Sequence, residues 1–154
     1  MDTSLIGLFK NVCFWAPFLA WLCAQFTKML CGFSRTRRLD FNYLVSTGGM
    51  PSAHSAMVSG LATSVGLTVG FGSASFAVSL AFALLVMFDA STVRRAAGLQ
   101  ARLLNQIVDE LFKEHRLSEK KLAELLGHTR LEVGLGMLVG IFTAMLVSSL
   151  WILA

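Results

Sequence analysis

The feature that most constrains the fold is a long stretch without a charged side chain. No Lys, Arg, Asp or Glu occurs between Phe41 and Phe88, and none occurs from Val133 to Ala154. A helix that crosses the hydrocarbon core of a bilayer needs about 20 mostly apolar residues, so each stretch can hold at least one. With 55% hydrophobic residues and a mean hydropathy of +0.68, the chain is expected to be an integral membrane protein.

The predicted fold class is all-α: a small polytopic bundle of transmembrane helices with an additional amphipathic helix at the membrane interface. The whole chain, 1–154, is expected to form a single membrane-embedded domain. Its expected spans, in chain order, are about 4–30, 51–70, 74–90 and 129–154. The segment 91–128 is basic and amphipathic, and it is expected to be helical and to lie on the cytoplasmic side.

Small residues recur at helical spacing within two of these spans. Gly60, Gly66 and Gly70 would allow another helix to approach the second span closely. Gly136 and Gly140 would do the same in the last span, below its start. Small-residue faces in so short a chain also predict a homodimer.

Basic residues indicate the orientation of the chain. Arg35, Arg37 and Arg38 precede the second span, and the segment 91–128 is basic as well. Because basic loops mark the cytoplasmic side, both segments are expected at that face of an inner, plasma or organelle membrane, in contact with membrane lipids. The net charge of +4 is explained in this way, and without a recognised nucleic-acid-binding module no nucleic acid is expected as a partner.

The most distinctive local pattern, Thr-Gly-Gly-Met-Pro-Ser-Ala-His-Ser-Ala, precedes and enters the second span. Gly48 and Gly49 allow a sharp turn, and Pro51 suits the first position of a helix. Ser52 and His54 then fall in the first turn, where backbone amides and the helix dipole form an anion site. Since a histidine exchanges a proton near neutral pH, this corner predicts a phosphate whose ester bond is cleaved with the help of an acid.

A second pair of polar residues stands at the start of the last span. His128 and Glu132 are four residues apart and therefore lie on one face of a helix. The carboxylate can accept from one ring nitrogen, leaving the other to act as a base or nucleophile. The alternative is a capping histidine beside an incidental surface glutamate.

Further charged residues stand at the expected ends of the first and third spans. Lys28 and Arg35 flank the first, and Arg94 and Arg95 follow Asp89 after the third. Interfacial arginines commonly contact lipid headgroups, so a role in a site remains open at this point. Asp89 is expected either to hold one of these arginines or to bind a metal.

Three motifs in this order resemble one known family. They are Thr-Gly-Gly-Met-Pro-Ser-Ala-His-Ser-Ala, then Met-Phe-Asp-Ala with Val-Arg-Arg-Ala-Ala-Gly, then Leu-Gly-His-Thr-x-x-Glu-Val. Over nearly its whole length the chain looks like the divergent branch of the type-2 phosphatidic acid phosphatase superfamily. That branch is described as acid phosphatase/vanadium-dependent haloperoxidase-related.

The wider superfamily has the motifs Lys-x6-Arg-Pro, Pro-Ser-Gly-His and Ser-Arg-x5-His-x3-Asp. Lys28 and Arg35 match the first without its proline, and the residues ending at His54 match the second with alanine for glycine. His128 and Glu132 match the third in part, because glutamate replaces aspartate and a leucine stands where the arginine belongs.

The resemblance implies a metal-independent phosphatase that needs no cofactor. It implies that His128 is the nucleophile that forms a phosphohistidine, that His54 protonates the leaving alcohol, and that Glu132 orients the nucleophile. The phosphate of the substrate would be bound by Lys28, Arg35, Ser52, Arg94 and Arg95, and we expect that Arg94 or Arg95 fills the place of the missing arginine. Asp89, Gly48 and Gly49 would support the site.

The function implied is hydrolysis of a phosphomonoester or diphosphate of a membrane lipid, such as phosphatidate, phosphatidylglycerophosphate or an isoprenoid phosphate. The alternative is a non-catalytic membrane protein that binds or carries phosphorylated lipids, which the degraded third motif favours. A CDP-alcohol phosphotransferase would need several aspartates on neighbouring turns for two metals, and the region of Asp89 offers one. The last alternative is a membrane scaffold with no small-molecule site. It would not explain why both motif histidines are expected at the same face of the membrane.

Overall fold

The computed structural model describes residues 5–36, 49–111 and 127–153. Its helices are α1 (Leu5–Phe9), α2 (Val12–Thr36), α3 (Ala53–Val69), α4 (Ala74–Ser91), α5 (Val93–Leu111) and α6 (Arg130–Leu153). The described residues contain no strand, and the predicted all-α fold is confirmed. Two helical stretches are long and apolar enough to cross a membrane, one over Ala74–Val108 and the other α6.

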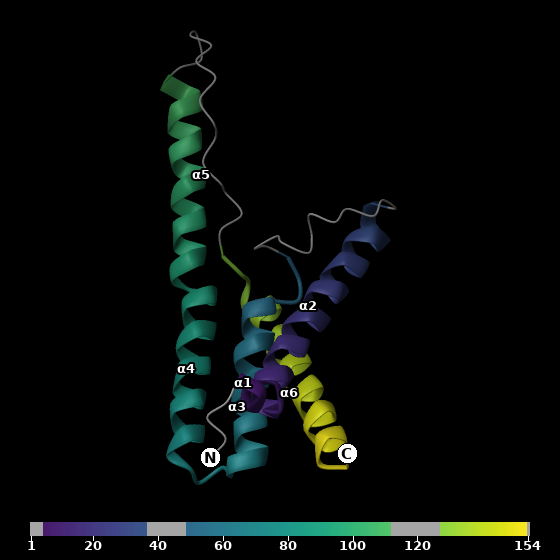
Figure 1. Ribbon diagram of the computed structural model, residues 1–154. Coiled ribbons are helices and arrows are strands. Elements are labelled where there is room, and N and C mark those ends of the chain that lie inside the picture. The colour runs from purple at the N-terminus through teal and green to yellow at the C-terminus, as the bar shows by residue number, and fades with distance from the viewer. Residues whose placement is uncertain (1–4, 37–48, 112–126, 154) are drawn as a thin grey trace.

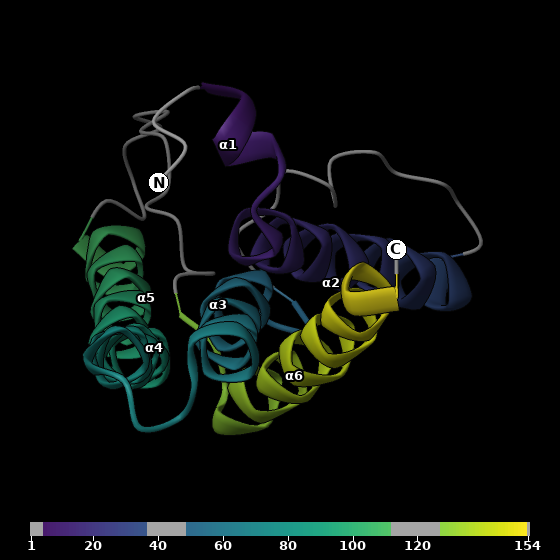
Figure 2. The same cartoon turned by 60° about the horizontal axis from the view of Figure 1, so that its bottom comes forward.

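The central helix of the bundle is α3. Viewed from its end, it lies between α4 on one side and α2 and α6 on the other (Figure 2). Apart from two valines, the buried residues of α3 are all alanine, serine or glycine. Small side chains allow the backbones of neighbouring helices to approach closely, which is how membrane helices associate without large apolar side chains between them.

The backbones of α3 and α6 are in direct contact at two glycines. A methyl group added to Gly136 or Gly140 would overlap atoms of α3, at Gly140 the carbonyl oxygen of Ala56 and the hydroxyl of Ser59. The Ser59 hydroxyl also donates to the carbonyl oxygen of Met137 across this interface, at 3.1 Å. The predicted close approach at both glycines is therefore confirmed.

The α2 helix packs against α3 at Gly60, beside α6. A methyl group there would lie 3.0 Å from Cβ of Ala20 and 3.4 Å from Cα of Pro17. Ala16, Ala20 and Ala24 of α2 are all fully buried. As in the contact with α6, small residues on both helices set a short distance between the two axes.

The expected helix contact at Gly66 and Gly70 is wrong. A methyl group on Gly66 would meet the ring of Phe71, which folds back after the end of α3, and one on Gly70 would meet nothing within 4 Å. Gly70 is the C-cap of α3 and has a φ of +100°. This backbone conformation is accessible to glycine and disfavoured for other residues, so Gly70 ends the helix rather than packing it.

The stretch expected as one first span forms two helices, α1 and α2. They separate at Asn11, because its side-chain oxygen accepts from the backbone N–H of Cys13 at 2.9 Å and caps the start of α2. The indole N–H of Trp15 donates to the carbonyl oxygen of Phe9 at 2.8 Å and ties the two helices together. Pro17 lies inside α2, which continues past it to Thr36.

The α4 and α5 helices follow one another directly and form a long column. At the end of α4, the N–H of Thr92 donates to the carbonyl oxygens of Phe88 and Asp89, at 3.0 and 3.3 Å, and α5 begins at the next residue. In Figure 1 the column of α4 and α5 extends well past the start of α3. The expected helical segment beyond Leu111 lies outside the described residues.

Candidate active site

The turn that leads into α3 is organised by Ser52. The sequence suggested Pro51 as the first helical residue, but Ser52 is the N-cap and the helix starts one residue later. The Ser52 hydroxyl accepts from the backbone N–H of Ser55 at 3.4 Å and from the Ser55 hydroxyl at 3.0 Å. Since Ser52 is fully buried, its side chain stabilises the start of α3 from inside the bundle.

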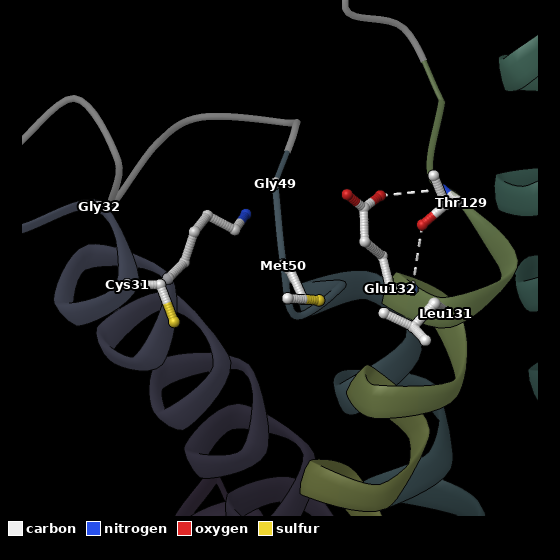
Figure 3. A pocket seen from close by; sticks show the side chains of 8 residues that line it. Cys31, Gly32, Gly49, Met50, Thr129, Leu131 and Glu132 are labelled. Carbon is white, nitrogen blue, oxygen red and sulfur yellow. Dashed lines mark hydrogen bonds between the residues drawn. The ribbon is translucent and has the colours of Figure 1, made fainter. Parts of the chain in front are cut away.

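A reciprocal pair of hydrogen bonds between Thr129 and Glu132 caps the start of α6. The Glu132 carboxylate accepts from the backbone N–H of Thr129 at 2.8 Å, and the Thr129 hydroxyl accepts from the N–H of Glu132 at 3.3 Å (Figure 3). This capping box fixes the position of the carboxylate. Nδ1 of His128 lies 3.5 Å from the same carboxylate oxygen, so the box holds the carboxylate beside the imidazole.

Two backbone hydrogen bonds hold this segment against the other helices. The N–H of His128 donates to the carbonyl oxygen of Ala90, in the last turn of α4, at 3.0 Å. The N–H of Ser52 donates to the carbonyl oxygen of Glu132, also at 3.0 Å. Segments that are distant in the sequence are thereby joined at one end of the bundle.

The two motif histidines face each other at this junction. The ring centroids of His54 and His128 are 6.4 Å apart, with 48° between the ring planes. His128 is buried, with 4% of its surface exposed, whereas His54 is exposed. A nucleophile acts about 3–3.5 Å from the reacting atom, and a proton donor acts about 3 Å from the leaving oxygen. Two imidazoles at this separation are close enough to act on the same group. The pair can therefore flank one phosphoryl group.

A small cavity of about 130 Å³ opens beside His128, between α5 and the start of α6. We call it the arginine pocket, because it is lined by Arg95 and Arg102 together with His128 and Thr129. The two arginines are seven residues apart and so lie on one face of α5. A water molecule needs about 10–15 Å³ of such a space, so the pocket is large enough for one small anion.

A second cavity, of about 220 Å³, lies between α2, the turn before α3 and the start of α6 (Figure 3). We call it the lysine pocket, and Lys28, Gly49, Thr129 and Glu132 contribute to its wall. Lys28 is only 3% exposed and interacts attractively with the Glu132 carboxylate. Gly49 has a φ of +90°, and a methyl group there would lie 3.5 Å from the aliphatic part of Lys28. The glycine thus provides both the turn and the room for the lysine.

Most of the predicted site residues gather at this end of the bundle. Those that line one of the pockets or pair with a residue that does are Lys28, Gly49, His54, Arg95, His128 and Glu132. Asp89 is half-buried in the last turn of α4, next to the carbonyl that accepts from His128. Gly48 and the side chains of Arg35 and Arg94 lie outside the described part of the structure. Within the described part, no group of three or more His, Cys, Asp or Glu could hold a metal ion.

Two residues of the site were not predicted from the sequence. Thr129 stands three residues before Glu132, and this Thr-x-x-Glu spacing is a recognisable sign of a capping box. Arg102 stands seven residues after Arg95, a spacing that places both side chains on the same helix face. Both spacings can be recognised in the sequence. However, only the packing of α5 beside the start of α6 brings Arg102 next to His128.

Comparisons with known proteins identify the family of the chain. A family model described as the Divergent PAP2 family matches residues 9–143, which include both pockets and both histidines. The chain is 42% identical over 136 residues to the "Uncharacterized membrane protein YuiD" of Bacillus subtilis (strain 168), covering 81% of this chain and 86% of that protein. No solved structure matches. The resemblance inferred from the three motifs is thus confirmed, and the chain belongs to the Divergent PAP2 family of membrane proteins.

Proposed function

We propose that the protein is an integral membrane phosphatase that hydrolyses a phosphate ester of a lipid through a phosphohistidine on His128. The observation that carries this proposal is the meeting of His54 and His128, 6.4 Å apart, with a carboxylate 3.5 Å from one of them. Two arginines line the pocket in which His128 lies. A structural histidine would need neither the second imidazole nor the cations.

The chemistry follows from which nitrogen of His128 faces Glu132. Because Nδ1 faces the carboxylate, it carries the proton, and Nε2 is the nucleophile that attacks phosphorus. The bond from phosphorus to the lipid oxygen breaks, and protonated His54 gives its proton to that oxygen. Water, deprotonated by His54, then attacks the phosphohistidine, which releases inorganic phosphate and restores both histidines.

The arginine pocket would stabilise the charge on the phosphoryl oxygens during both steps. Replacing Arg102 by alanine is therefore expected to lower kcat by about 10²- to 10³-fold, the usual loss when a stabilising donor is removed from a transition state. Arg130→Ala is the matched control, since Arg130 is exposed at the first residue of α6 and lines neither pocket. Phosphate release from purified protein measures both, and equal rates for the two variants would contradict the role of Arg102.

The function itself is tested by phosphate release in detergent from a panel of lipid phosphates, with a chelator present throughout. Release that persists with the chelator and depends on both histidines is the expected result. Protein that binds lipid phosphates but releases no phosphate would instead be the non-catalytic carrier, which the partial third motif favours. Loss of release on chelation would overturn the metal-independent mechanism.

We also propose that the site lies on the cytoplasmic face. The support is the cluster of basic residues at this end of the bundle, Arg95 and Arg102 among those described, because basic segments remain on the cytoplasmic side. Labelling of single cysteines introduced in α5, with a reagent that does not cross the membrane, tests the orientation. Labelling of intact cells from outside would contradict it.

A further inference from the structure

The α5 helix has two unlike faces. One face contains Arg95, Gly98 and Arg102, which line the arginine pocket. Away from that face, a line of exposed residues recurs at alternating spacings of four and three along the helix: Val93, Ala97, Gln100, Leu104 and Ile107. Val93, Leu104 and Ile107 are 50–60% exposed. We call this line the α5 seam, because the same spacing marks the contact line of a two-stranded coiled coil.

We propose that the α5 seam pairs with the same seam of a second copy of this chain, as a parallel two-stranded coiled coil. The glycines from which a homodimer was expected are used within one chain, Gly60 against α2 and Gly136 and Gly140 against α3. The surface that joins two copies is therefore a different one. This pairing does not require that the protein hydrolyse phosphate.

The first support is that α5 extends beyond the membrane. The helical stretch Ala74–Val108 has 35 residues, about 52 Å at about 1.5 Å for each residue, whereas the hydrocarbon core of a bilayer is about 30 Å thick. The 18 residues of α4 nearly account for that thickness, and α5 continues the column past the start of α3 (Figure 1). The exposed apolar side chains of α4 can face lipid, whereas the α5 seam of a single copy would face water. Apolar surface in water is stabilised by burial against a partner.

The second support is that the α5 seam is neutral. Two copies in one membrane have the same orientation, so the two-fold axis between them runs along the membrane normal. Their α5 helices are then parallel, and each seam residue meets its own counterpart. A charged surface that meets its own copy is repelled, but the five seam residues carry no charge. Arg95 and Arg102 lie at the arginine pocket instead, so pairing keeps these cations away from the contact.

The third support is Gln100, a polar residue in the middle of the α5 seam. Its carboxamide both donates and accepts hydrogen bonds, so it is complementary to a second Gln100 across a two-fold axis. Against lipid or an apolar partner the same group would lose its hydrogen bonds to water. In coiled coils a single polar residue of this kind fixes the register and the number of helices, at some cost in stability. Gln100 thus favours a second copy over other apolar surroundings.

The membrane compensates for the short length of the seam. The α5 helix has 19 residues, whereas coiled coils are usually sustained over about three or four heptads. Both copies are already held in one plane and one orientation by their spans, which raises the effective concentration of one seam at the other. Pairing also leaves the arginine pocket open, because Arg95 and Arg102 line it from another face of the helix.

Disulfide crosslinking in native membranes tests the pairing. The starting variant has serine in place of the native cysteines, Cys13, Cys23 and Cys31. Val93→Cys and Ile107→Cys are then made separately. Facing seam positions lie within the distance of about 4.4–6.8 Å between Cα atoms that a disulfide needs, so oxidation is expected to double the apparent mass of 16.7 kDa in both variants. Gln106→Cys is the matched control, because Gln106 is exposed next to Ile107 but lies off the seam, and it is expected to stay monomeric.

Substitution of Gln100 tests the contact at the axis. Gln100→Glu brings two like charges together and is expected to raise the dissociation constant of the pair by at least about fivefold, the effect of two charges 4 Å apart even in water. Gln100→Leu removes a polar group from the contact and is expected to lower it. Energy transfer between labelled copies in vesicles of varied protein-to-lipid ratio measures both, with Gln106→Glu as the control. Equal dissociation constants for all three variants would overturn the pairing through the α5 seam.

Other occupants of the α5 seam give different results. Crosslinking of Val93→Cys only to Ile107→Cys, in a mixture of the two, would mean antiparallel helices. Quenching of a fluorophore on Leu104→Cys by brominated lipids, in protein that does not crosslink, would mean that α5 lies on the bilayer. A crosslinked product of any other mass would mean another protein. Each of these results overturns the proposal, and none of them depends on phosphate release, so the pairing and the phosphatase are tested separately.

Discussion

Replacement of His128 by alanine is expected to abolish phosphate release, because the nitrogen that takes up the phosphoryl group is lost. Removal of His54 is expected to be less severe, a decrease in kcat of about 10²- to 10⁴-fold, the typical contribution of a general acid or base. The difference follows from their roles: without His54 water can still protonate the leaving oxygen slowly, whereas nothing replaces the covalent intermediate. Release of inorganic phosphate under single-turnover conditions measures both variants.

The intermediate provides a second measurement. Rapid quenching of wild-type protein with a lipid labelled in its terminal phosphate should trap label that is stable to alkali and lost in acid, as expected of a phosphohistidine. His128→Ala should trap none. His115→Ala is the matched control, since His115 is the remaining one of the three histidines of the chain and has no part in the proposed mechanism. Full activity of His128→Ala would refute the assignment of the nucleophile.

Replacement of Gly140 by alanine is expected to lower the free energy of unfolding by about 1–3 kcal/mol, the usual cost of overpacking. The new methyl group would overlap the carbonyl oxygen of Ala56, which belongs to the backbone of α3 and cannot turn aside. Separation of α3 from α6 would also move His54 away from His128. A displacement of about 1 Å in an active site can cost about 10²-fold in rate, so activity should fall as well.

The matched control lies on the same helix. A methyl group on Gly134 would meet nothing within 4 Å, so Gly134→Ala is expected to raise the free energy of unfolding by about 0.5–1 kcal/mol, the gain of alanine over glycine in a helix. The same substitution thus has opposite expected effects on stability at two positions six residues apart. Unfolding in mixed micelles with increasing sodium dodecyl sulfate measures both. Equal stability of the two variants would contradict the backbone contact between α3 and α6.

Local spacing was sufficient for several parts of the site. His128 and Glu132 lie together because residues four apart share a helix face, and the structure places Nδ1 of His128 3.5 Å from the carboxylate. Gly136 and Gly140 continue the same face, so the close approach of another helix below the pair followed from the sequence as well. Each of these features depends only on the period of one helix.

Other features could not be obtained from spacing, because they depend on competition between partners. Ser52 suited an anion site as well as it suited a helix cap, and the structure uses its hydroxyl to accept from Ser55 inside the bundle. The first span was expected to be continuous, yet Asn11 caps a new helix within it. At Ser52 the side chain had two plausible roles, and the surrounding packing selected one of them.

The sequence alone determined that the chain is helical, membrane-embedded and a member of its family, since composition, periodicity and motif order need no knowledge of contacts. It did not determine how the motifs meet. That depends on the bonds from Ser52 to Glu132 and from His128 to Ala90, which join segments distant in the chain. It also depends on α5, which brings Arg102 to His128 and leaves Lys28 in a separate pocket. Distances between helices arise from the packing of all of them together, and no local pattern contains them.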